Sequence, residues 1–439
     1  MLKVLKFGGS SMADAKQYQK VRSIVESDPA RKVVVVSAAG KRFSEDHKIT
    51  DLLYLCHAHL NYGVPCDTVF KMISDRYCSI RDDCGLQTDI EGELAKIRQK
   101  METGISEDEL VSRGEYLSAK LMADYLGFDF VDASRWIRFR FDGTVDTEKS
   151  YRLLRDLATN RKVVIPGFYG AMPNGAIRVM SRGGSDITGA LAAAALDADV
   201  YENWTDVSGI LMADPRIVED PKPIEHITYD ELRELSYMGA QVLHEGTVFP
   251  VRERNIPVNI RNTNDPDNPG SLIRESFDDT GDAESGFVTG IAGRKNFTII
   301  TVTKNGLSTM VGGLRTILET FEKFEVSVEY VPSGIDNVSV VVSAKNIAES
   351  QYAILADLQK NFRPDSINVT EDIAIVAVVG RKMASKPGMS GKLFAALGEN
   401  NINIRMISQG TEEFNIIAGV KNDDFEKTVR VLYNSFVKK

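Results

Sequence analysis

Short apolar runs that alternate with long helical patterns constrain the fold of this chain most strongly. Residues 33–36 are consecutive valines, which is typical of a strand buried on both faces of a parallel sheet. Residues 162–166 (KVVIP) form a second such run, and a third begins near residue 199. Helical patterns lie around them, over 52–61, 93–101, 116–125, 150–158 and 187–196. This order predicts an α/β domain with an open, mostly parallel sheet sandwiched by helices.

A polar stretch over residues 264–286 separates this domain from a second region. It begins with a turn cluster (NDPDNPG) and continues as an acidic segment, which is typical of a linker. Beyond it the sequence predicts strand, helix, strand, strand and helix twice over, in units of about 70 residues. Such ferredoxin-like α+β units leave sheet edges open and tend to pair. We therefore expect three domains, over 1–290, 297–371 and 372–439.

Length and composition restrict the class of protein. A chain of 439 residues is long for one core. Its formal net charge of −9 disfavours nucleic acid and anionic membranes as partners, and no apolar run approaches the ~20 residues of a membrane span. The four cysteines lie at spacings that match no zinc pair. With no signal peptide in view, we expect reduced thiols and a cytoplasmic protein.

The first strand runs into a glycine turn that suits an anion. Residues 4–11 (VLKFGGSS) place Lys6 beside Gly8 and Gly9, whose backbone N–H groups can approach a ligand closely. A helical pattern over 14–25 follows, and a helix N-terminus favours phosphate. On these residues alone, a phosphate site and a buried strand with a tight turn are equally good interpretations.

Residues 181–186 (SRGGSD) are the strongest anion-site signal in the chain, and they lead into an alanine-rich helical pattern. Arg182 can bind a carboxylate or phosphate through two parallel hydrogen bonds, and the glycines can supply backbone donors. Asp186 suits an orienting role or a metal–phosphate role. The alternative is an aspartate that caps the helix, but capping does not explain the arginine and both glycines.

Three further clusters are less specific. Residues 36–40 (VSAAG) follow a buried strand, where ligands bind in open α/β sheets, or they form a close-packed turn. Glu115, within SRGE, either caps a helix or holds an ammonium group. Residues 203–216 offer the aromatic face of Trp204 and the cation of Arg216 to a nucleotide, although ordinary turns explain the second half of this segment equally well.

In this order, the clusters resemble the motifs of the aspartate kinases, within the amino acid kinase family. The similarity covers essentially the whole chain through KFGGSS, VVVSA, SRGE, SRGGSD, NWTDVSGI, DPR and MGAQVLH. The repeated C-terminal units resemble tandem ACT domains, the amino-acid sensors of this family. Ser10 stands where threonine is usual, Leu211 where an ATP-stacking tyrosine is common, and Gln241 where many members have lysine.

The resemblance implies that ATP, with Mg²⁺, phosphorylates the β-carboxylate of L-aspartate to 4-phospho-L-aspartate, the first step of lysine, threonine and methionine biosynthesis. It implies Lys6 and Asp186 as the catalytic residues, and it assigns no protein side chain as a metal ligand. The ATP-binding residues it implies are Lys6, Gly8, Gly9, Ser10, Gly184, Thr205, Asp206 and Arg216. The substrate-binding residues it implies are Ser37, Thr50, Glu115, Arg182, Gly183 and Ser185, with Arg182 on the α-carboxylate and Glu115 on the α-ammonium.

The ACT resemblance further implies feedback by lysine and/or threonine, bound between ACT units of a homodimer or homotetramer. The expected effector-binding positions are Met310, Gly313, Leu314, Val328 and Glu329, for which ordinary core and turn packing is the alternative. Two other functions stay open. A glutamate or acetylglutamate kinase is disfavoured by SRGE and the ACT units, and a catalytically silent sensor is disfavoured by the retained charged residues. No homoserine dehydrogenase region is in view, so we expect a monofunctional kinase.

Overall fold

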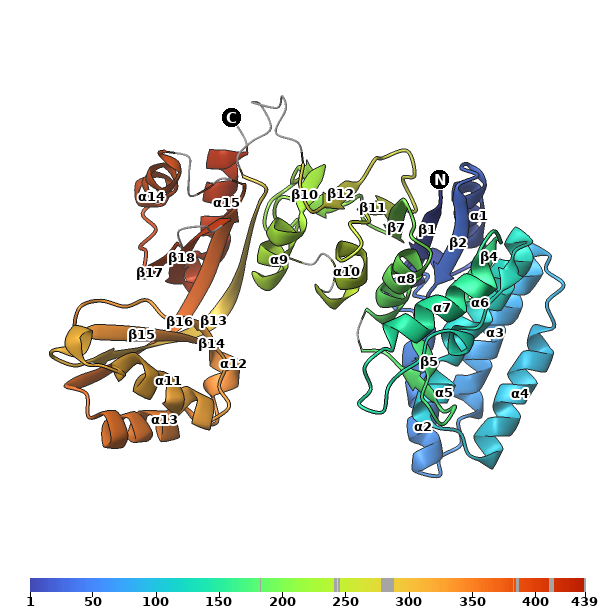
Figure 1. Cartoon of the computed structure of the whole chain (residues 1–439), viewed down its shortest axis with the longest axis horizontal. Helices are drawn as coiled ribbons and strands as arrows, with labels where there is room; N and C mark the ends of the chain where they lie inside the picture. Colours follow the sequence, from blue (N-terminus) through green and yellow to red (C-terminus); the bar gives the residue numbers. More distant parts are fainter. Residues whose placement is uncertain are drawn as a thin grey trace. The chain divides into compact units, whose positions relative to one another are not determined.

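The chain folds into two units, each built around its own sheet (Figure 1). The computed structural model describes residues 1–439 except 182, 241–242, 244, 278–287, 382, 384–386, 410–413 and 438–439, and except the side chains of 245 and 246. The first unit comprises Met1–Ile210, Pro223–Tyr229 and Val242–Asp278. The second comprises Leu211–Lys222, Asp230–Gln241 and Asp279–Lys439. Two short segments that interrupt the first unit in the sequence, Leu211–Lys222 and Asp230–Gln241, therefore belong to the second unit.

An eight-stranded sheet in the order β10-β12-β11-β7-β1-β2-β4-β3 forms the centre of the first unit. All its neighbouring strands run parallel except β11 and β12. The expected open, mostly parallel sheet is therefore confirmed. Its strands are β1 (Lys3–Phe7), β2 (Arg31–Val36), β3 (Asp129–Phe130), β4 (Val163–Pro166), β7 (Val200–Thr205), β10 (His226–Thr228), β11 (Val258–Asn262) and β12 (Ser271–Arg274). The shorter strands outside it are β5 (Tyr169–Ala171), β6 (Ile177–Val179), β8 (Ile210–Leu211) and β9 (Pro223–Ile224).

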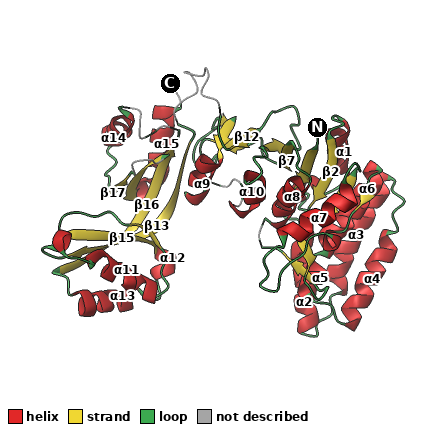
Figure 2. Ribbon diagram, viewed as in Figure 1, coloured by secondary structure: helices red, strands yellow, loops and turns green. Residues whose placement is uncertain are grey.

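Helices cover both faces of this sheet (Figure 2). Several begin at a side chain that accepts a hydrogen bond from the first turn, as Asp14 does from the Gln17 N–H at 3.0 Å. The helices of the first unit are α1 (Ala15–Glu26), α2 (Ile49–Asn61), α3 (Asp67–Cys84), α4 (Ile90–Thr103), α5 (Glu107–Val111), α6 (Arg113–Leu126), α7 (Thr147–Ala158), α8 (Gly184–Ala195) and α10 (Glu245–Arg252). Two 3₁₀ turns, η1 (Gly9–Met12) and η2 (Ala133–Arg135), accompany them. Helix α9 (Tyr229–Tyr237) belongs to the second unit except for its first residue.

The alternation of side chains along β1 separates the core of the first unit from its polar side. Leu5 and Phe7 pack into an apolar core with Tyr18 and Val21 of α1. Lys6 points to the opposite face, where it meets the first turn of α8. One strand therefore contributes both to the core and to a charged cluster.

A six-stranded sheet in the order β14-β15-β13-β16-β18-β17 forms the centre of the second unit. Its two longest strands, β13 (Gly290–Thr303) and β16 (Ser366–Val379), pair antiparallel along nearly their whole length. The remaining strands are β14 (Val328–Tyr330), β15 (Asn337–Ser343), β17 (Met406–Ser408) and β18 (Asn415–Lys421). Its helices are α11 (Gly313–Lys323), α12 (Ala344–Ile347), α13 (Gln351–Asp357), α14 (Met389–Glu399) and α15 (Phe425–Phe436), with short turns η3 (Leu307–Thr309), η4 (Leu358–Phe362) and η5 (Asn422–Asp424).

Both long strands serve two halves of this sheet. Residues 297–303 of β13 pair with β15, whereas residues 373–379 of β16 pair with β18. The half around β18 therefore also uses residues 290–294 of β13, which pair with residues 375–379 of β16 and precede the first predicted unit. The predicted domain boundaries at 297 and at 371–372 fall inside β13 and β16, and those boundaries stay a prediction.

Segment 211–222 joins the second unit through apolar and backbone contacts. Ala213 and Val218 belong to the same buried cluster as Val376 and Tyr433. The backbone N–H of Ile291 donates to the carbonyl of Met212 at 2.7 Å. The sequence pattern did not reveal this pairing, because it joins residues about 80 positions apart through contacts that no local periodicity encodes.

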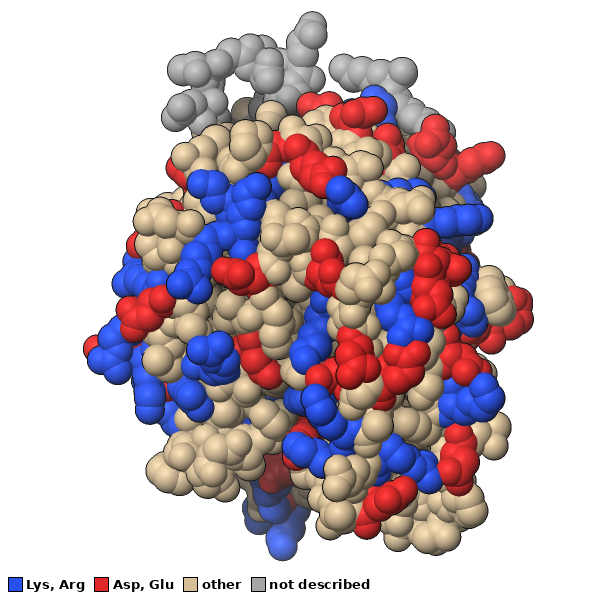
Figure 3. Space-filling model, turned by 90° about the vertical axis from the view of Figure 1, so that its right-hand side faces the viewer, with Lys and Arg blue, Asp and Glu red and all other residues tan. Residues whose placement is uncertain are grey.

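Acidic and basic side chains are intermixed on the face shown in Figure 3. Surface ion pairs such as Lys71–Asp75 at 2.8 Å and Arg98–Asp67 at 2.6 Å illustrate this mixing in the first unit. Exposed pairs of this kind contribute roughly 0–1 kcal/mol each to stability. Among the described residues, no helix has the length and apolar character that crossing a membrane requires.

Candidate active site

The glycine turn after β1 lies at the carboxyl edge of the central sheet. Gly8 follows β1 directly, and its backbone N–H donates to the carbonyl of Trp204 on β7 at 3.0 Å. The Ser37 N–H, just beyond β2, donates to the carbonyl of Phe7 at 3.1 Å. The ends of β1, β2 and β7 are therefore tied together at the edge where open α/β sheets bind ligands.

Two of the small-residue turns at this edge touch through their backbones. The Gly40 N–H donates to the carbonyl of Gly9 at 2.8 Å. A Cβ on Gly40 would lie 2.6 Å from the carbonyl carbon and oxygen of Gly9, which is closer than such atoms approach. Glycine at position 40 is therefore required by the close approach of the two turns.

The N-terminus of α8 places Asp186 over the first strand. Gly183 precedes the helix with φ of 80°, a backbone conformation that favours glycine. The Asp186 carboxylate accepts from the Lys6 ammonium, with 2.5 Å between Nζ and Oδ1. Lys6 is only 8% exposed, so this ion pair is largely shielded from water. The structure thus brings together the two residues expected to be catalytic.

Glu115 lies in the first turn of α6 and is 4% exposed. Burial raises the pKa of this carboxyl to about 8, and the backbone N–H groups of Ala38 and Glu115 and the charges of Arg113 and Lys6 offset only part of that increase. Its Oε2 atom has no hydrogen-bond partner among the described residues. A buried carboxylate with an unused oxygen suits a cationic ligand.

The other predicted site residues are distributed around this cluster or lie apart from it. Ser10 is in η1, Thr50 is in the first turn of α2, and Thr205 ends β7 beside Asp206. Gly184 and Ser185 begin α8. Arg216 belongs to the second unit, where it pairs with Asp214 at 2.6 Å. Arg182 and Gln241 lie outside the described residues.

The prediction that Trp204 offers an aromatic face to a nucleotide is wrong. Its side chain is fully buried, and its indole N–H donates to Glu202 at 3.0 Å. The guanidinium groups of Arg31 and Arg261 lie 5.3 Å and 4.7 Å from the ring centre. The ring therefore packs against two cations of the protein itself, and Trp204 has a structural role instead of facing a ligand.

Asn203 is a site residue that the sequence analysis did not single out. It is 2% exposed, and its amide donates to Oδ1 of Asp186 at 3.0 Å. The signal was present, since an amide within a buried strand is unusual for a purely structural position. Strand periodicity alone could not reveal which face of β7 carries Asn203.

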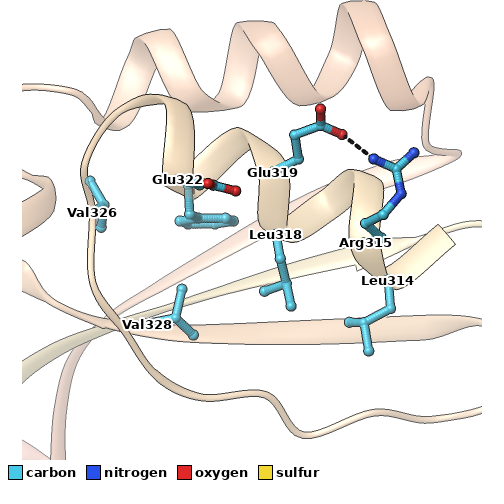
Figure 4. A pocket seen from close by; sticks show the side chains of 8 residues that line it. Leu314, Arg315, Leu318, Glu319, Glu322, Val326 and Val328 are labelled. Carbon is cyan, nitrogen blue, oxygen red and sulfur yellow. Dashed lines mark hydrogen bonds and ion pairs between the residues drawn. The ribbon is translucent and has the colours of Figure 1, made fainter. Parts of the chain in front are cut away.

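The expected effector positions lie in the second unit, around a groove of about 690 Å³ between α11 and β14. Figure 4 shows Leu314, Leu318 and Val328 lining it, with Glu319 and Glu322 nearby. Gly313 directly precedes Leu314, Met310 lies one turn earlier in the chain, and a Cβ on Gly313 would come within 3.3 Å of the Met310 sulfur. The carboxylate of Glu329 already has two partners within the protein, since it accepts from Arg294 at 2.8 Å and from the Tyr237 hydroxyl at 2.5 Å.

Comparison with known proteins assigns this arrangement to a family. Residues 1–262 match the amino acid kinase family, and residues 376–436 match an ACT domain. The chain is 35% identical to aspartokinase 3 of Bacillus subtilis (strain 168) over 454 residues, which cover 99% of this chain and 98% of that protein. The chain belongs to the aspartokinases of the amino acid kinase family.

Solved aspartokinase structures agree with this membership. The crystal structure of the aspartate kinase of Clostridium acetobutylicum is 48% identical in sequence, with a TM-score of 0.89 and 99% of each chain covered. That of E. coli aspartokinase III in complex with aspartate and ADP is 27% identical, with a TM-score of 0.75 and 100% of each chain covered. The fold of this chain therefore matches that of solved aspartate kinases along its whole length, in agreement with the aspartate kinase motifs in its sequence.

Proposed function

We propose that this aspartokinase transfers the γ-phosphoryl group of ATP to the β-carboxylate of L-aspartate. A carboxylate nucleophile has a pKa near 4 and is ionised at pH 7, so the reaction needs no general base. The difficulty is electrostatic, because an anion must approach the negatively charged phosphates. Positioning and charge neutralisation then supply most of the catalysis.

Lys6 would neutralise charge on the transferred phosphoryl group. Its ammonium is largely shielded from water, which strengthens its interaction with an anion. The backbone N–H groups of Gly9 and Gly184 would contribute further donors, and α8 would add the positive end of its dipole. Ser10, Thr205 and Asp206 would bind other parts of ATP, and we keep Arg216 as a prediction for the nucleotide as well.

Asp186 would orient Lys6 and face the phosphates. No group of three or more described His, Cys, Asp or Glu side chains could hold a metal ion by itself. The single Asp186 carboxylate fits Mg²⁺ that enters with ATP, because Mg²⁺ keeps waters and phosphate oxygens as ligands and uses few protein carboxylates. Bound in this way, Mg²⁺ would neutralise charge on the phosphate oxygens.

Glu115 would bind the α-ammonium of L-aspartate with its unpartnered oxygen. Ser37, Thr50, Gly183 and Ser185 would line the substrate side, and Arg182 remains our prediction for the α-carboxylate. The observation that carries the proposal is the convergence of Lys6, Asp186 and the buried Glu115 in one unit, beside two glycine turns.

Hydroxylamine trapping tests the reaction and its substrate. The protein is incubated with Mg-ATP, hydroxylamine and one acceptor, which is L-aspartate, L-glutamate or N-acetyl-L-glutamate in three separate reactions. The acyl hydroxamate formed in each reaction is then measured. We expect a hydroxamate with L-aspartate at least about 100-fold faster than with the others, since a longer chain misplaces the reacting carboxylate. Preference for a glutamate substrate, or no hydroxamate at all, would reject the proposal.

Lysine and/or threonine would act as feedback inhibitors at the groove of the second unit. Its apolar wall of Leu314, Leu318 and Val328 suits an aliphatic chain, and Glu322 suits an ammonium group. Glu319 already pairs with Arg315 at 2.9 Å (Figure 4). A crystal structure of E. coli aspartokinase III holds lysine and aspartate in a T-state. Strand β14 is an edge strand, so a second copy of the chain could pair there in a homodimer or homotetramer.

Inhibition by each amino acid tests this regulatory role. We expect lysine or threonine to lower the rate, and we expect Leu314→Glu to weaken that inhibition by adding a charge to the apolar wall. A rate unchanged by lysine, threonine and methionine alike would reject feedback through this groove.

A further inference from the structure

Asn203 connects the two catalytic residues from a third element. In the parallel pairing of β1 and β7, Asn203 lies directly opposite Lys6. Its amide donates to Oδ1 of Asp186 at 3.0 Å, the same oxygen that Lys6 contacts at 2.5 Å. A strand, a neighbouring strand and the first turn of a helix therefore meet at one carboxylate oxygen.

We propose that Asn203 is a positioning residue that fixes the orientation of the Asp186 carboxylate against Lys6. The proposal rests on the function proposed above and adds a residue to it. A lysine ammonium is a point charge on a flexible stem, so it attracts a carboxylate without defining its rotation. An amide N–H is directional, and a second donor on the same oxygen restricts the carboxylate to one orientation.

Burial makes this contact persistent. Asn203 is 2% exposed, so water cannot readily replace Asp186 as the acceptor for its amide. Leaving a buried amide without a partner costs roughly 1–3 kcal/mol. The side chain of Asp186 is 20% exposed, so its free end faces the surface of the site.

The contact from Asn203 gives the two carboxylate oxygens of Asp186 different roles. Among the described residues, both contacts of the Asp186 carboxylate are made by Oδ1. Oδ2 therefore stays available to a ligand while Oδ1 holds Lys6. A neutral amide suits this role, because a second carboxylate would leave one ammonium shared between two anions and a second cation would compete with Lys6.

Tyr201 provides a matched control on the same strand. It lies two residues before Asn203 on the same face of β7, and its hydroxyl donates to the backbone carbonyl of Asp186 at 3.1 Å. Both side chains therefore bond to the same residue, but only Asn203 bonds to the carboxylate. Tyr201→Phe removes a hydrogen bond to α8 without touching the orientation of that carboxylate.

The test compares Asn203→Leu, Asn203→Asp and Tyr201→Phe in the full chain. Asn203→Leu keeps the volume and removes the donor, so kcat should fall about 10- to 100-fold while KM for aspartate stays within about threefold. Its thermal midpoint should not fall, because an apolar side chain replaces a buried amide. Asn203→Asp should add a new ionisation to the pH profile of kcat, which a merely structural role would not do.

Tyr201→Phe should keep kcat within about threefold of the unmodified protein. A crystal structure of Asn203→Leu gives a readout that does not depend on turnover, and it should show the Asp186 carboxylate rotated or in two conformers. Unchanged kcat and an unchanged Asp186 contact in Asn203→Leu would overturn the proposal, as would an equal kcat loss in Tyr201→Phe. Absence of aspartate turnover in the unmodified protein would instead reject the proposed function, and the crystal structure would still decide the role of Asn203.

Discussion

At the scale of single residues, the site depends on two carboxylates in different surroundings, since Glu115 is buried and Asp186 is partly exposed. Asp186 contacts Lys6 at 2.5 Å, so its charge is balanced within the protein. Among the residues that the structure describes, Glu115 has no such partner at Oε2, and burial raises its pKa to about 8. Two carboxyl groups with different surroundings can take different roles, one toward the phosphates and one toward the substrate ammonium.

Glu115 makes aspartate binding depend on pH. The free site holds a proton on this carboxyl below about pH 8, and an ammonium ligand requires that proton to leave. The affinity for aspartate should therefore rise with pH, by at most about tenfold per unit, and level off above pH 8. Calorimetry in buffers of different ionisation enthalpy should detect proton release on binding at pH 7.

Glu115→Gln is the control, and it should remove the proton release and weaken aspartate binding. The same ionisation affects stability. Because the folded state keeps a proton that the unfolded chain loses near pH 4.5, the free energy of unfolding falls between about pH 4.5 and pH 8. Glu115→Gln should flatten this decline. Proton-neutral binding by the unmodified protein at pH 7 would contradict the assignment.

Residue types and order singled out Lys6, Asp186 and Glu115, because these charges stand near glycines or at helix starts, and the family resemblance supplied the roles expected of them. Asn203 and Trp204 follow one another in β7, yet one contacts Asp186 and the other is buried beside Arg31. The two side chains differ in their surroundings because they lie on opposite faces of the strand. That face is fixed by packing against α1 and α8, so single-residue chemistry could not decide it.

At the scale of elements, the site depends on the close approach of the two turns that follow β1 and β2. The backbone contact between Gly9 and Gly40 joins the turn after β1 to the turn after β2. The sequence predicted most of the strands and helices around these turns from periodicity. It did not predict helix α3, although Phe70, Ile73, Tyr77 and Ile80 recur there at helical spacing. It also did not predict the pairing of β13 with β16, because contacts between distant residues and not local patterns decide that pairing.

Gly40→Ala should separate the two turns. The added Cβ would lie 2.6 Å from the Gly9 backbone, and no side-chain rotation can relieve that contact. We expect the free energy of unfolding to fall by about 1–3 kcal/mol and KM for ATP to rise about tenfold. Urea unfolding and initial-rate kinetics measure the two effects.

Gly391→Ala is a matched control for this change. Gly391 lies inside helix α14, and a Cβ there would have no atom of the described residues within 4 Å, apart from its own helix backbone. This substitution should stabilise the protein by about 0.5–1 kcal/mol through helix propensity alone. If Gly40→Ala proved as harmless as Gly391→Ala, close approach of the two turns would not be important for the site.

At the scale of the whole molecule, the shared strands of the second unit bear on how it unfolds. Strands β13 and β16 each pair within both halves of the six-stranded sheet. The two halves keep separate apolar cores, one around Ile300 and one around Ile416. Disruption of either core therefore reaches the other half through the strands that they share.

Ile300→Ala and Ile416→Ala test this coupling. Each removes a fully buried side chain and should lower stability by about 2–5 kcal/mol. Hydrogen exchange should show loss of amide protection in both halves with either variant, since neither half keeps a complete sheet alone. Protection lost only in the half that carries the substitution would contradict the coupling.

The position of the transferred phosphoryl group tests the central claim most directly. The protein is incubated with Mg-ATP and L-aspartate and then treated with borohydride, which reduces an acyl phosphate to an alcohol. Phosphorylation of the β-carboxylate predicts homoserine, and Lys6→Met should yield at most about one hundredth as much. Formation of 3-amino-4-hydroxybutanoate, or of no reduced amino acid above the level without ATP, would contradict the account.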